Sequence, residues 1–335
     1  METFDLIARL TAIHGPSGRE GAVSAAIAEL ARPFADDITT DTLGNLIVHR
    51  KGTGPRVLFA AHMDSIGLVA TYLEENGAVR FGKLGGVSPE NICNVPVRFE
   101  NGVLGAVKVD GKADKDKLTL DDLYLDIGAA SREEAAALVK LGDTAVYATV
   151  AGKAGKRIIS PYLDNRVSCA VLLMALEQLQ DWENDLYFVF TVQEEVGLRG
   201  AKTAAYGVDP DFAVAVDVTG AYDYPGAPKA GSAVLGGGAA VKVMDTSVIC
   251  HPKMVETLSA LAVKRKIPYQ IDVLTRGGTD AGAIHQSRLG VVTGGISIPC
   301  RYTHTPTETA DLSDVEACTR LVVAFAQSKI ETQEL

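Results

Sequence analysis

The chain has 335 residues, which is enough for one large domain or two domains of moderate size. Its 47% hydrophobic and 22% charged residues are ordinary for a globular protein, and no apolar run approaches the roughly 20 residues of a membrane helix. The net charge of −10 argues against nonspecific binding to nucleic acids or to anionic membranes. Five scattered cysteines without a CxxC pair argue against a disulfide framework and a thiolate zinc site, so we expect a cytoplasmic protein.

The first part of the chain is predicted to contain two helices followed by two strands. Apolar residues repeat near one face over 6–13, and the segment HGPSG at 14–18 ends this helix. A second apolar repeat over 23–30 predicts another helix. Strand-like segments follow at 46–50 and 57–62, and the second is a continuous apolar run that is typical of a strand buried on both faces.

The pattern of predicted secondary structure changes between about residues 68 and 156. Short strand-like pieces alternate with Gly, Asn and Asp turns, and the helical stretch 132–141 interrupts them. This pattern predicts a compact, mostly β unit. The strand-like pieces are 68–73, 95–99, 104–109 and 144–150.

From residue 157 onward, predicted helices and strands alternate again. A doubly wound mixed α/β sheet is the expected fold class, with one discontinuous catalytic domain (1–67 and 157–335) and an inserted small β-rich domain (68–156). The predicted elements are a helix at 165–180, a strand at 186–192, a helix near 199–206, a strand at 212–218, a helix at 252–266, strands at 269–274 and 291–298, and a terminal helix over 312–325.

Five residues of the kinds that bind metals lie where predicted apolar strands end. The crevice of an open α/β sheet lies at the carboxyl ends of its strands, so we expect these side chains to meet there. A sixth residue, Glu194, directly precedes one of them and leaves a spare carboxylate that suits a general base beside a metal. The five candidate ligands are His62, Asp164, Glu195, Asp217 and His304.

Each of these signals has an ordinary alternative when it is considered alone. His62 and Asp64 share one face of an extended segment, so Asp64 suits orienting a metal-bound histidine, although an isolated HxD is more often a surface pair. Asp164, like Asn165, is equally compatible with capping the following helix. Adjacent glutamates are often simply exposed to water. Asp217 interrupts an apolar run, where an unpaired buried carboxylate would be costly without a metal or a strong hydrogen bond.

Eight short motifs occur in an order that resembles one family of peptidases over essentially the whole chain. They are HGPSGRE, AHMDSIG, DLYLDIGA, LDNR, QEEVG, VDV, RGGTDAGAIH and RYTHTPTE. The series resembles the deblocking or glutamyl (TET-type) aminopeptidases, which are cytosolic dinuclear metallopeptidases with a phosphorylase/hydrolase-like catalytic domain. Many relatives have a glutamate after the HMD triplet, whereas this chain has Ser65.

The resemblance implies two divalent metal ions per subunit, zinc or cobalt first and manganese as an alternative. It implies that the β-rich insert serves oligomer assembly, with dimers that form a dodecamer. It also implies a role for each candidate residue: Asp164 as the bridging ligand, His62 and Asp217 at the first metal, Glu195 and His304 at the second, Glu194 as general base, and Asp64 as the support of His62.

The expected function is therefore that of a metal-dependent aminopeptidase that removes residues from peptides with a free N-terminus. A first alternative is a related dinuclear metallo-amidohydrolase or deacylase, which would not require a free amine. A second is a noncatalytic metal-binding shell protein, although such a protein needs no spare base such as Glu194. A glycan hydrolase would explain the acidic pair but not the two histidines.

Overall fold

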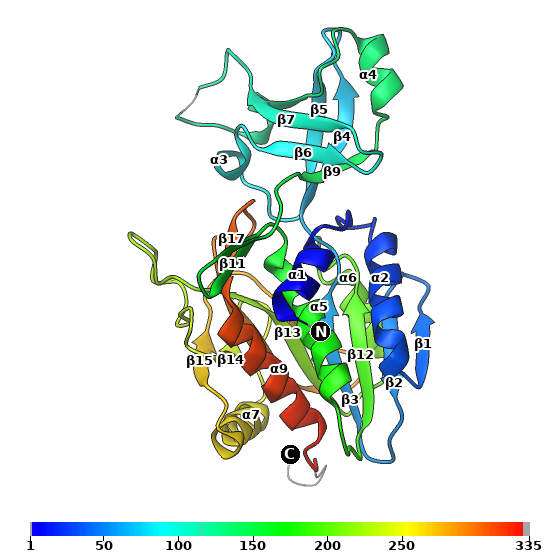
Figure 1. Ribbon diagram of the computed structural model, residues 1–335, viewed down its shortest axis with the longest axis vertical. Helices are drawn as coiled ribbons and strands as arrows, with labels where there is room; N and C mark the ends of the chain where they lie inside the picture. The colour runs from blue at the N-terminus through cyan, green and yellow to red at the C-terminus, as the bar shows by residue number, and fades with distance from the viewer. Residues whose placement is uncertain (1, 115, 331–335) are drawn as a thin grey trace.

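The computed structural model describes residues 2–114 and 116–330 and shows a large α/β body that carries a smaller β body at one end (Figure 1). The large body is built on an eleven-stranded mixed sheet. Its main path runs in the order β1 (Asp37–Thr40), β2 (Leu46–Arg50), β12 (Asp185–Thr191), β3 (Arg56–His62), β13 (Phe212–Gly220), β16 (Val292–Arg301), β17 (Glu308–Asp311), β11 (Arg157–Ser160) and β10 (Gly152–Ala154), and β14 (Ala239–Met244) with β15 (Tyr269–Val273) branches from β16.

The centre of this sheet is parallel and is covered by helices on both faces. Strands β12, β3, β13 and β16 are parallel neighbours. Along β3, Phe59 packs in the core on one face, whereas Leu58 and Ala60 pack on the other, as the alternation of side chains in a strand requires. One face is covered by α1 (Thr3–Thr11), α2 (Gly21–Ala31), α5 (Leu163–Gln178), α7 (Pro252–Arg265) and α9 (Leu312–Ala326), and the other by α6 (Arg199–Val208) and α8 (Ala281–Ile284).

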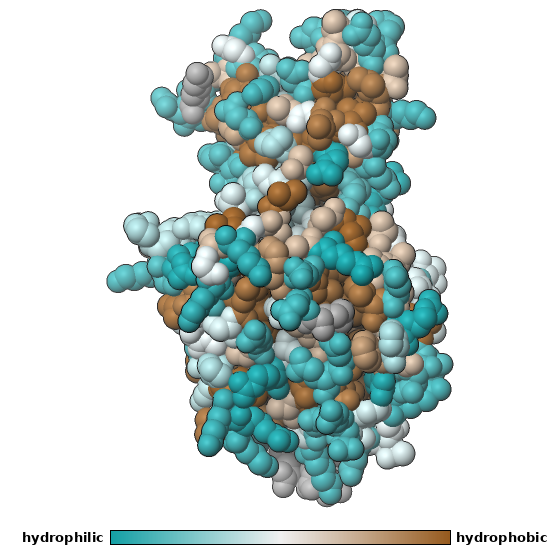
Figure 2. All heavy atoms as spheres, viewed as in Figure 1, coloured by the Kyte–Doolittle hydropathy of each residue, from teal (hydrophilic) through white to brown (hydrophobic). Residues whose placement is uncertain are grey.

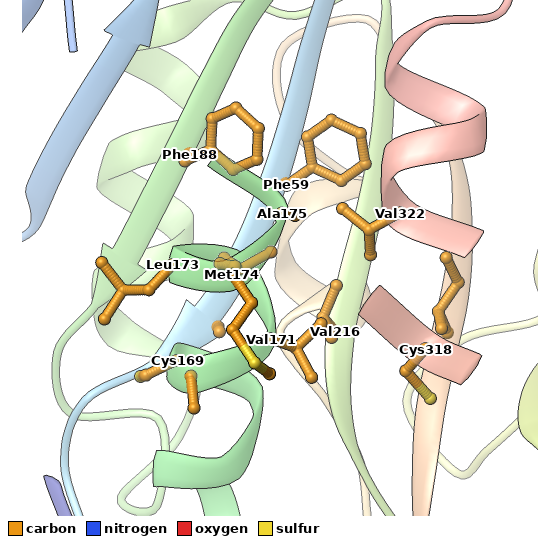
Figure 3. Close-up of a cluster of buried hydrophobic side chains, with 14 of the residues drawn as sticks. Phe59, Cys169, Val171, Leu173, Met174, Ala175, Phe188, Val216, Cys318 and Val322 are labelled. Carbon is orange, nitrogen blue, oxygen red and sulfur yellow. The ribbon is translucent and has the colours of Figure 1, made fainter. Parts of the chain in front are cut away.

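The larger of the two core layers lies between the sheet and the first group of helices (Figure 3). The Phe59 and Phe188 rings stack with centroids 5.1 Å apart, and Phe325 of α9 meets Phe59 edge-on at 6.0 Å. Cys169 and Cys318 are buried here, and the described cysteines form no disulfide.

The smaller body is a closed six-stranded barrel with its own hydrophobic core. Its strands follow β3 directly in the chain, and the chain returns to the large sheet at β10. The strands lie in the order β4 (Gly67–Leu73), β5 (Val79–Leu84), β8 (Leu123–Asp126), β7 (Leu104–Val109), β6 (Pro96–Phe99) and β9 (Thr144–Tyr147), and α3 (Pro89–Ile92) and α4 (Arg132–Leu138) lie between them in sequence.

The predicted elements occur in the structure with small shifts at their ends, but several short strands were missed. In β8 only Leu123 and Leu125 are buried, which leaves too short an alternation to read from sequence. One positional expectation is wrong, because Asp217 lies inside β13, which continues to Gly220. The other missed strands are β1, β5, β10, β11, β14 and β17.

A buried arginine fastens the N-terminal segment to the end of β3. Arg166 has no exposed surface, and its guanidinium donates to the carbonyls of Met63 (2.5 Å), Leu10 (2.8 Å), Ile13 (3.2 Å) and Gly15 (2.9 Å). A carbonyl that loses a charged donor inside a protein is left without water to replace it. This single side chain therefore holds together three parts of the chain.

Replacement of this arginine should destabilise the fold strongly. We expect Arg166→Met to lower the free energy of unfolding by about 3 kcal/mol or more, because four buried carbonyl contacts are lost at once. Arg9→Met, at an exposed ion pair with Glu29, should change it by about 0.5 kcal/mol or less. Urea unfolding of both variants measures the difference, and equal stabilities would contradict this account of Arg166.

Candidate metal centre

Three neighbouring parallel strands bring most of the candidate residues to one edge of the sheet. His62 is the last residue of β3 and is paired in register with Thr191, the last residue of β12. Glu194 and Glu195 follow in the loop after β12, and Asp217 lies on β13 at the other side of β3. All four candidates line one cavity of about 450 Å³ together with Asp164 and His304.

Asp164 lies between the two histidines. Its Oδ1 is 3.1 Å from His62 Nε2, and its Oδ2 is 3.2 Å from His304 Nε2. Although Asp164 falls within the bounds of α5, its own backbone and that of Asn165 are not helical. The helix begins after Tyr162 without a side-chain cap, and Asn165 donates instead to the carbonyl of Val216 at 3.0 Å. The capping alternative is therefore wrong for both residues.

The adjacent glutamates both turn into the cavity. Their side chains are only 10% and 4% exposed, so the alternative of a simple surface pair is wrong. Strand β12 ends before them, and Gln193 has a left-handed φ of 54°, which changes the direction of the chain. Glu195 Oε2 lies 3.2 Å from His304 Nε2, whereas Glu194 Oε2 lies 3.8 Å from His62 Nε2. The two carboxylates thus face different histidines.

Asp64 supports this loop as well as His62. Its side chain is fully buried, and its Oδ1 lies 3.5 Å from His62 Nδ1. The backbone N–H groups of Glu194 and Glu195 donate to its two carboxylate oxygens at 2.9 and 3.2 Å. Ser17 also donates its hydroxyl proton to Asp64, at 2.6 Å. The predicted pairing of His62 with Asp64 on one side of the segment is present, and Asp64 also orders the two glutamates.

Sequence reasoning missed two other carboxylates that hold the site. Glu308, which is buried, accepts from the backbone N–H of Asp164 at 2.9 Å and of His304 at 2.8 Å. Glu20 accepts from the backbone N–H of Gln193 at 3.1 Å. Glu20 is the last residue of the motif HGPSGRE, and Glu308 is the last residue of RYTHTPTE. Their place in motifs that support the family resemblance is the feature of the sequence that could have identified them.

The ionisable side chains of the site include more carboxylates than cationic groups. Burial raises the pKa of Glu194 well above its ordinary value, against the attraction of His62, and the charge of Asp217 raises it further. Burial opposes ionisation of Asp164 too, but hydrogen bonds from His304 and His62 outweigh it and lower the pKa of that carboxyl. Burial would lower the pKa of His304, yet Glu195 and Asp164 raise it to about 12.

This donor set suits divalent metal ions. Imidazole nitrogens with carboxylate oxygens are ligands typical of zinc, cobalt and manganese sites. Ligand atoms of His62, Asp164 and Glu195 all lie within 4.8 Å of one another, and so do those of His62, Glu194 and Asp217. Among the described residues, the buried Oε1 of Glu195 has no hydrogen-bond partner, as expected of an oxygen that is placed to bind a cation. The residues present therefore fit a metal.

The remaining wall of the cavity is formed by uncharged residues and one arginine, and it includes Gly277 and Gly278 of the glycine-rich segment GGTD at 277–280. Asp280, the last residue of that segment, is buried and accepts from the Thr191 hydroxyl, and burial raises its pKa to about 6. Ser65 does not line the cavity, because its backbone N–H pairs with the carbonyl of Gly15. The wall residues are Gly86, Gly197, Leu198, Val218, Thr219, Gly220, Tyr222, Leu274, Arg276, Gly277, Gly278 and Thr303.

Two histidines outside the site have ordinary polar partners. His14 Nε2 lies 2.9 Å from the hydroxyl of Thr144, and His49 Nε2 lies 2.7 Å from a carboxylate oxygen of Asp185. His251 precedes Pro252, which occupies the first turn of α7 as predicted. In the described ranges, His62 and His304 are the histidines that contact carboxylates of the cavity, whereas His49 lies near Asp37 and Asp185 outside it.

The chain is similar in sequence and in fold to known aminopeptidases. A putative aminopeptidase from Acetivibrio thermocellus is 47% identical over 96% of this chain and 98% of its own length. An aminopeptidase structure from the archaeon Desulfurococcus kamchatkensis matches with a TM-score of 0.94 and 40% identity, over 98% of this chain and 95% of that one. The TET1 peptidase of Pyrococcus horikoshii, described as assembling into a tetrahedron or a large octahedral shell, matches with a TM-score of 0.89 and 35% identity, over 98% of this chain and 100% of that one.

The family assignment follows from these similarities and from the sequence profile of the M42 glutamyl aminopeptidases, which matches residues 44–321. In the part of the chain that the structure describes, no helix is long and apolar enough to cross a membrane. The resemblance seen in the motifs is confirmed. The chain belongs to the M42 glutamyl aminopeptidase family and is a peptide-bond hydrolase.

Proposed function

We propose that the protein is a dinuclear metal-dependent aminopeptidase in which Glu194 is the general base. The observation that carries this proposal is the division of the glutamate pair, in which Glu195 faces His304 while Glu194 stands apart from that pair. A site that only stores metal has no need of a second, separately placed carboxylate. Two different roles for adjacent residues explain why both are buried in the cavity.

The ligand roles follow from the contacts of each carboxylate. Asp164 reaches both histidines and is proposed to bridge two divalent ions, zinc or cobalt first and manganese as an alternative. The first ion is assigned to His62 and Asp217, and the second to Glu195 and His304. Asp64 is proposed to keep the imidazole of His62 oriented, because its backbone carbonyl lies 3.1 Å and its carboxylate 3.5 Å from His62 Nδ1.

The proton transfers are assigned to Glu194. Two bound metal ions would activate water and polarise the scissile carbonyl. Glu194 lines the cavity and its Oε2 lies 3.8 Å from His62 Nε2, which places a carboxylate beside the proposed ligands, where it can accept a proton and then release it. Glu194 would take the proton of the attacking water and return it to the leaving amine. The fixed N–H···Asp64 contact of Glu194 holds its backbone in place during both transfers.

Substitution of Glu194 tests this role. We expect Glu194→Gln to lower kcat by about 10²–10⁴-fold, because the amide cannot accept the proton, while the stoichiometry of bound metal stays that of the parent. Glu256→Gln, at an exposed glutamate of α7, is the control and should leave kcat unchanged. Steady-state kinetics and metal analysis measure both quantities. Undiminished turnover of the Glu194 variant would rule out the proposed base.

The excess of carboxylates in the cavity also favours a cationic, free peptide N-terminus over a blocked one. We expect metal-stripped protein with zinc, cobalt or manganese restored to release only the N-terminal residue from free-amine peptides. Acetylated peptides should react at least about a hundredfold more slowly, because they lack the charge that the carboxylates attract. Equal turnover of both substrate sets would move the assignment to the alternative, a deacylase.

We further propose that 68–156 is an inserted assembly domain and that 1–67 with 157–335 is the catalytic domain. The TET1 relative is described as forming closed shells. On this chain, the barrel exposes apolar side chains on its surface, and Figure 2 shows hydrophobic residues on its visible face. Leu104 and Leu141 are 63% and 62% exposed, which favours burial against a second copy.

The mass of the particles in solution tests this assembly. We expect light scattering to give a mass several times that of the 35.3 kDa chain, up to a dodecamer. Paired Leu104→Glu and Leu141→Glu substitutions should shift the particles to a smaller mass, since each places a charge in an apolar interface. Leu289→Glu, at a fully exposed leucine outside the barrel, is the control. A monomeric parent protein would refute the proposal.

A further inference from the structure

Two glycines of the barrel lie directly against the candidate metal centre. Gly85 and Gly86 follow β5, and Gly86 lines the cavity that holds the candidate ligands. Gly85 has a left-handed φ of 77°, whereas Gly86 does not have a left-handed backbone. The barrel thus contributes backbone, rather than side chains, to this part of the cavity.

The absence of side chains at these positions is required by space. A Cβ on Gly86 would overlap the imidazole of His304, with Cε1 only 2.6 Å away. A Cβ on Gly85 would lie 3.0 Å from the side chain of Glu195 and 2.8 Å from that of Ile66. Non-bonded carbon atoms are comfortable at about 3.5–4.0 Å, so neither position accepts even alanine without movement of its neighbours.

The position of the His304 ring depends on this backbone more than the positions of the other candidate ligands do, because His304 is more exposed. Its side chain is 33% exposed, compared with 2% for His62 and 4% for Glu195, so the α/β body does not enclose it. Its Nε2 faces Asp164 and Glu195 at 3.2 Å, while Gly86 lies near the Nδ1 and Cε1 side of the same ring. The barrel backbone and the two carboxylates therefore hold the imidazole from opposite sides.

We propose that Gly85–Gly86 is a positioning wall that keeps the His304 imidazole within reach of Asp164 and Glu195. The inference rests on the proposed two-metal function, and it adds a contribution from the barrel to the second metal subsite. A side chain at residue 86 would push the ring away from both carboxylates. The consequence is a selective loss of affinity for one of the two ions rather than a general loss of the fold.

Gly86→Ala tests the role of this wall. Because Gly86 does not have a left-handed backbone, the substitution adds a Cβ without adding backbone strain. Gly82→Ala is the matched control, since it makes the same change four residues earlier on β5, where a Cβ meets only ordinary 3.5 Å contacts with Thr71 and Val69. Metal-stripped proteins are titrated with Co²⁺ by calorimetry. The parent and Gly82→Ala should bind two ions per chain, and Gly86→Ala should bind one ion normally and the other at least about tenfold more weakly.

A double variant separates positioning from general damage. In His304→Ala the ring is absent, so adding Gly86→Ala should cause no further loss of Co²⁺ affinity. If Gly86→Ala alone does not fold, the double variant should fold, because the overlapping ring has been removed. Binding of both ions by Gly86→Ala at parent affinity would overturn the inference, as would an unfolded or further weakened double variant. A parent that binds fewer than two ions would instead overturn the two-metal function on which the inference rests.

Discussion

The arrangement of the α/β body depends on holding several carboxylates together away from water. Four acidic side chains and two histidines occupy one cavity, and the carboxylates exceed the positive charge that the histidines can supply. Like charges at such separations raise the free energy of the folded protein unless cations or hydrogen bonds compensate. The raised pKa values of Glu194 and Asp217 and the strongly raised pKa of His304 are expressions of this one constraint. A pair of divalent ions is the compensation that best fits the donor atoms present.

Buried side chains around the cavity hold the segments that carry the candidate ligands. These buried side chains form a frame around the cavity. Asp64 and Glu308 are buried carboxylates that accept backbone N–H groups, and the donors belong to the segments that carry the ligands. Arg166 acts on the outer side of the same frame, where it ties the N-terminal segment to Met63, next to His62. Backbone donors fix the carboxylates without adding positive charge to the cavity. The negative charge of the cavity, which suits the proposed metal ions, is thereby preserved.

Much of this could be predicted from the sequence because the strands that matter are long and apolar. The run that ends at His62 and the run before Glu194 predict buried parallel strands, and their ends predict a shared edge. The sequence could not predict that Glu308 would accept from Asp164 and His304, because that contact depends on how β17 pairs with β11 and β16. Short strands such as β8, with two inward side chains, fall below the length at which periodicity is informative. Pairing between distant segments, rather than local propensity, determines these features.

The position of the barrel in the chain gives it access to the site. Its first strand begins at Gly67, only five residues after His62, so the chain leaves the sheet at the edge where the candidate ligands gather. The return of β5 toward that edge then brings Gly85 and Gly86 against Glu195 and His304. The barrel therefore does more than extend the surface of the molecule, because its backbone completes the wall of the cavity in which the chemistry is proposed to occur.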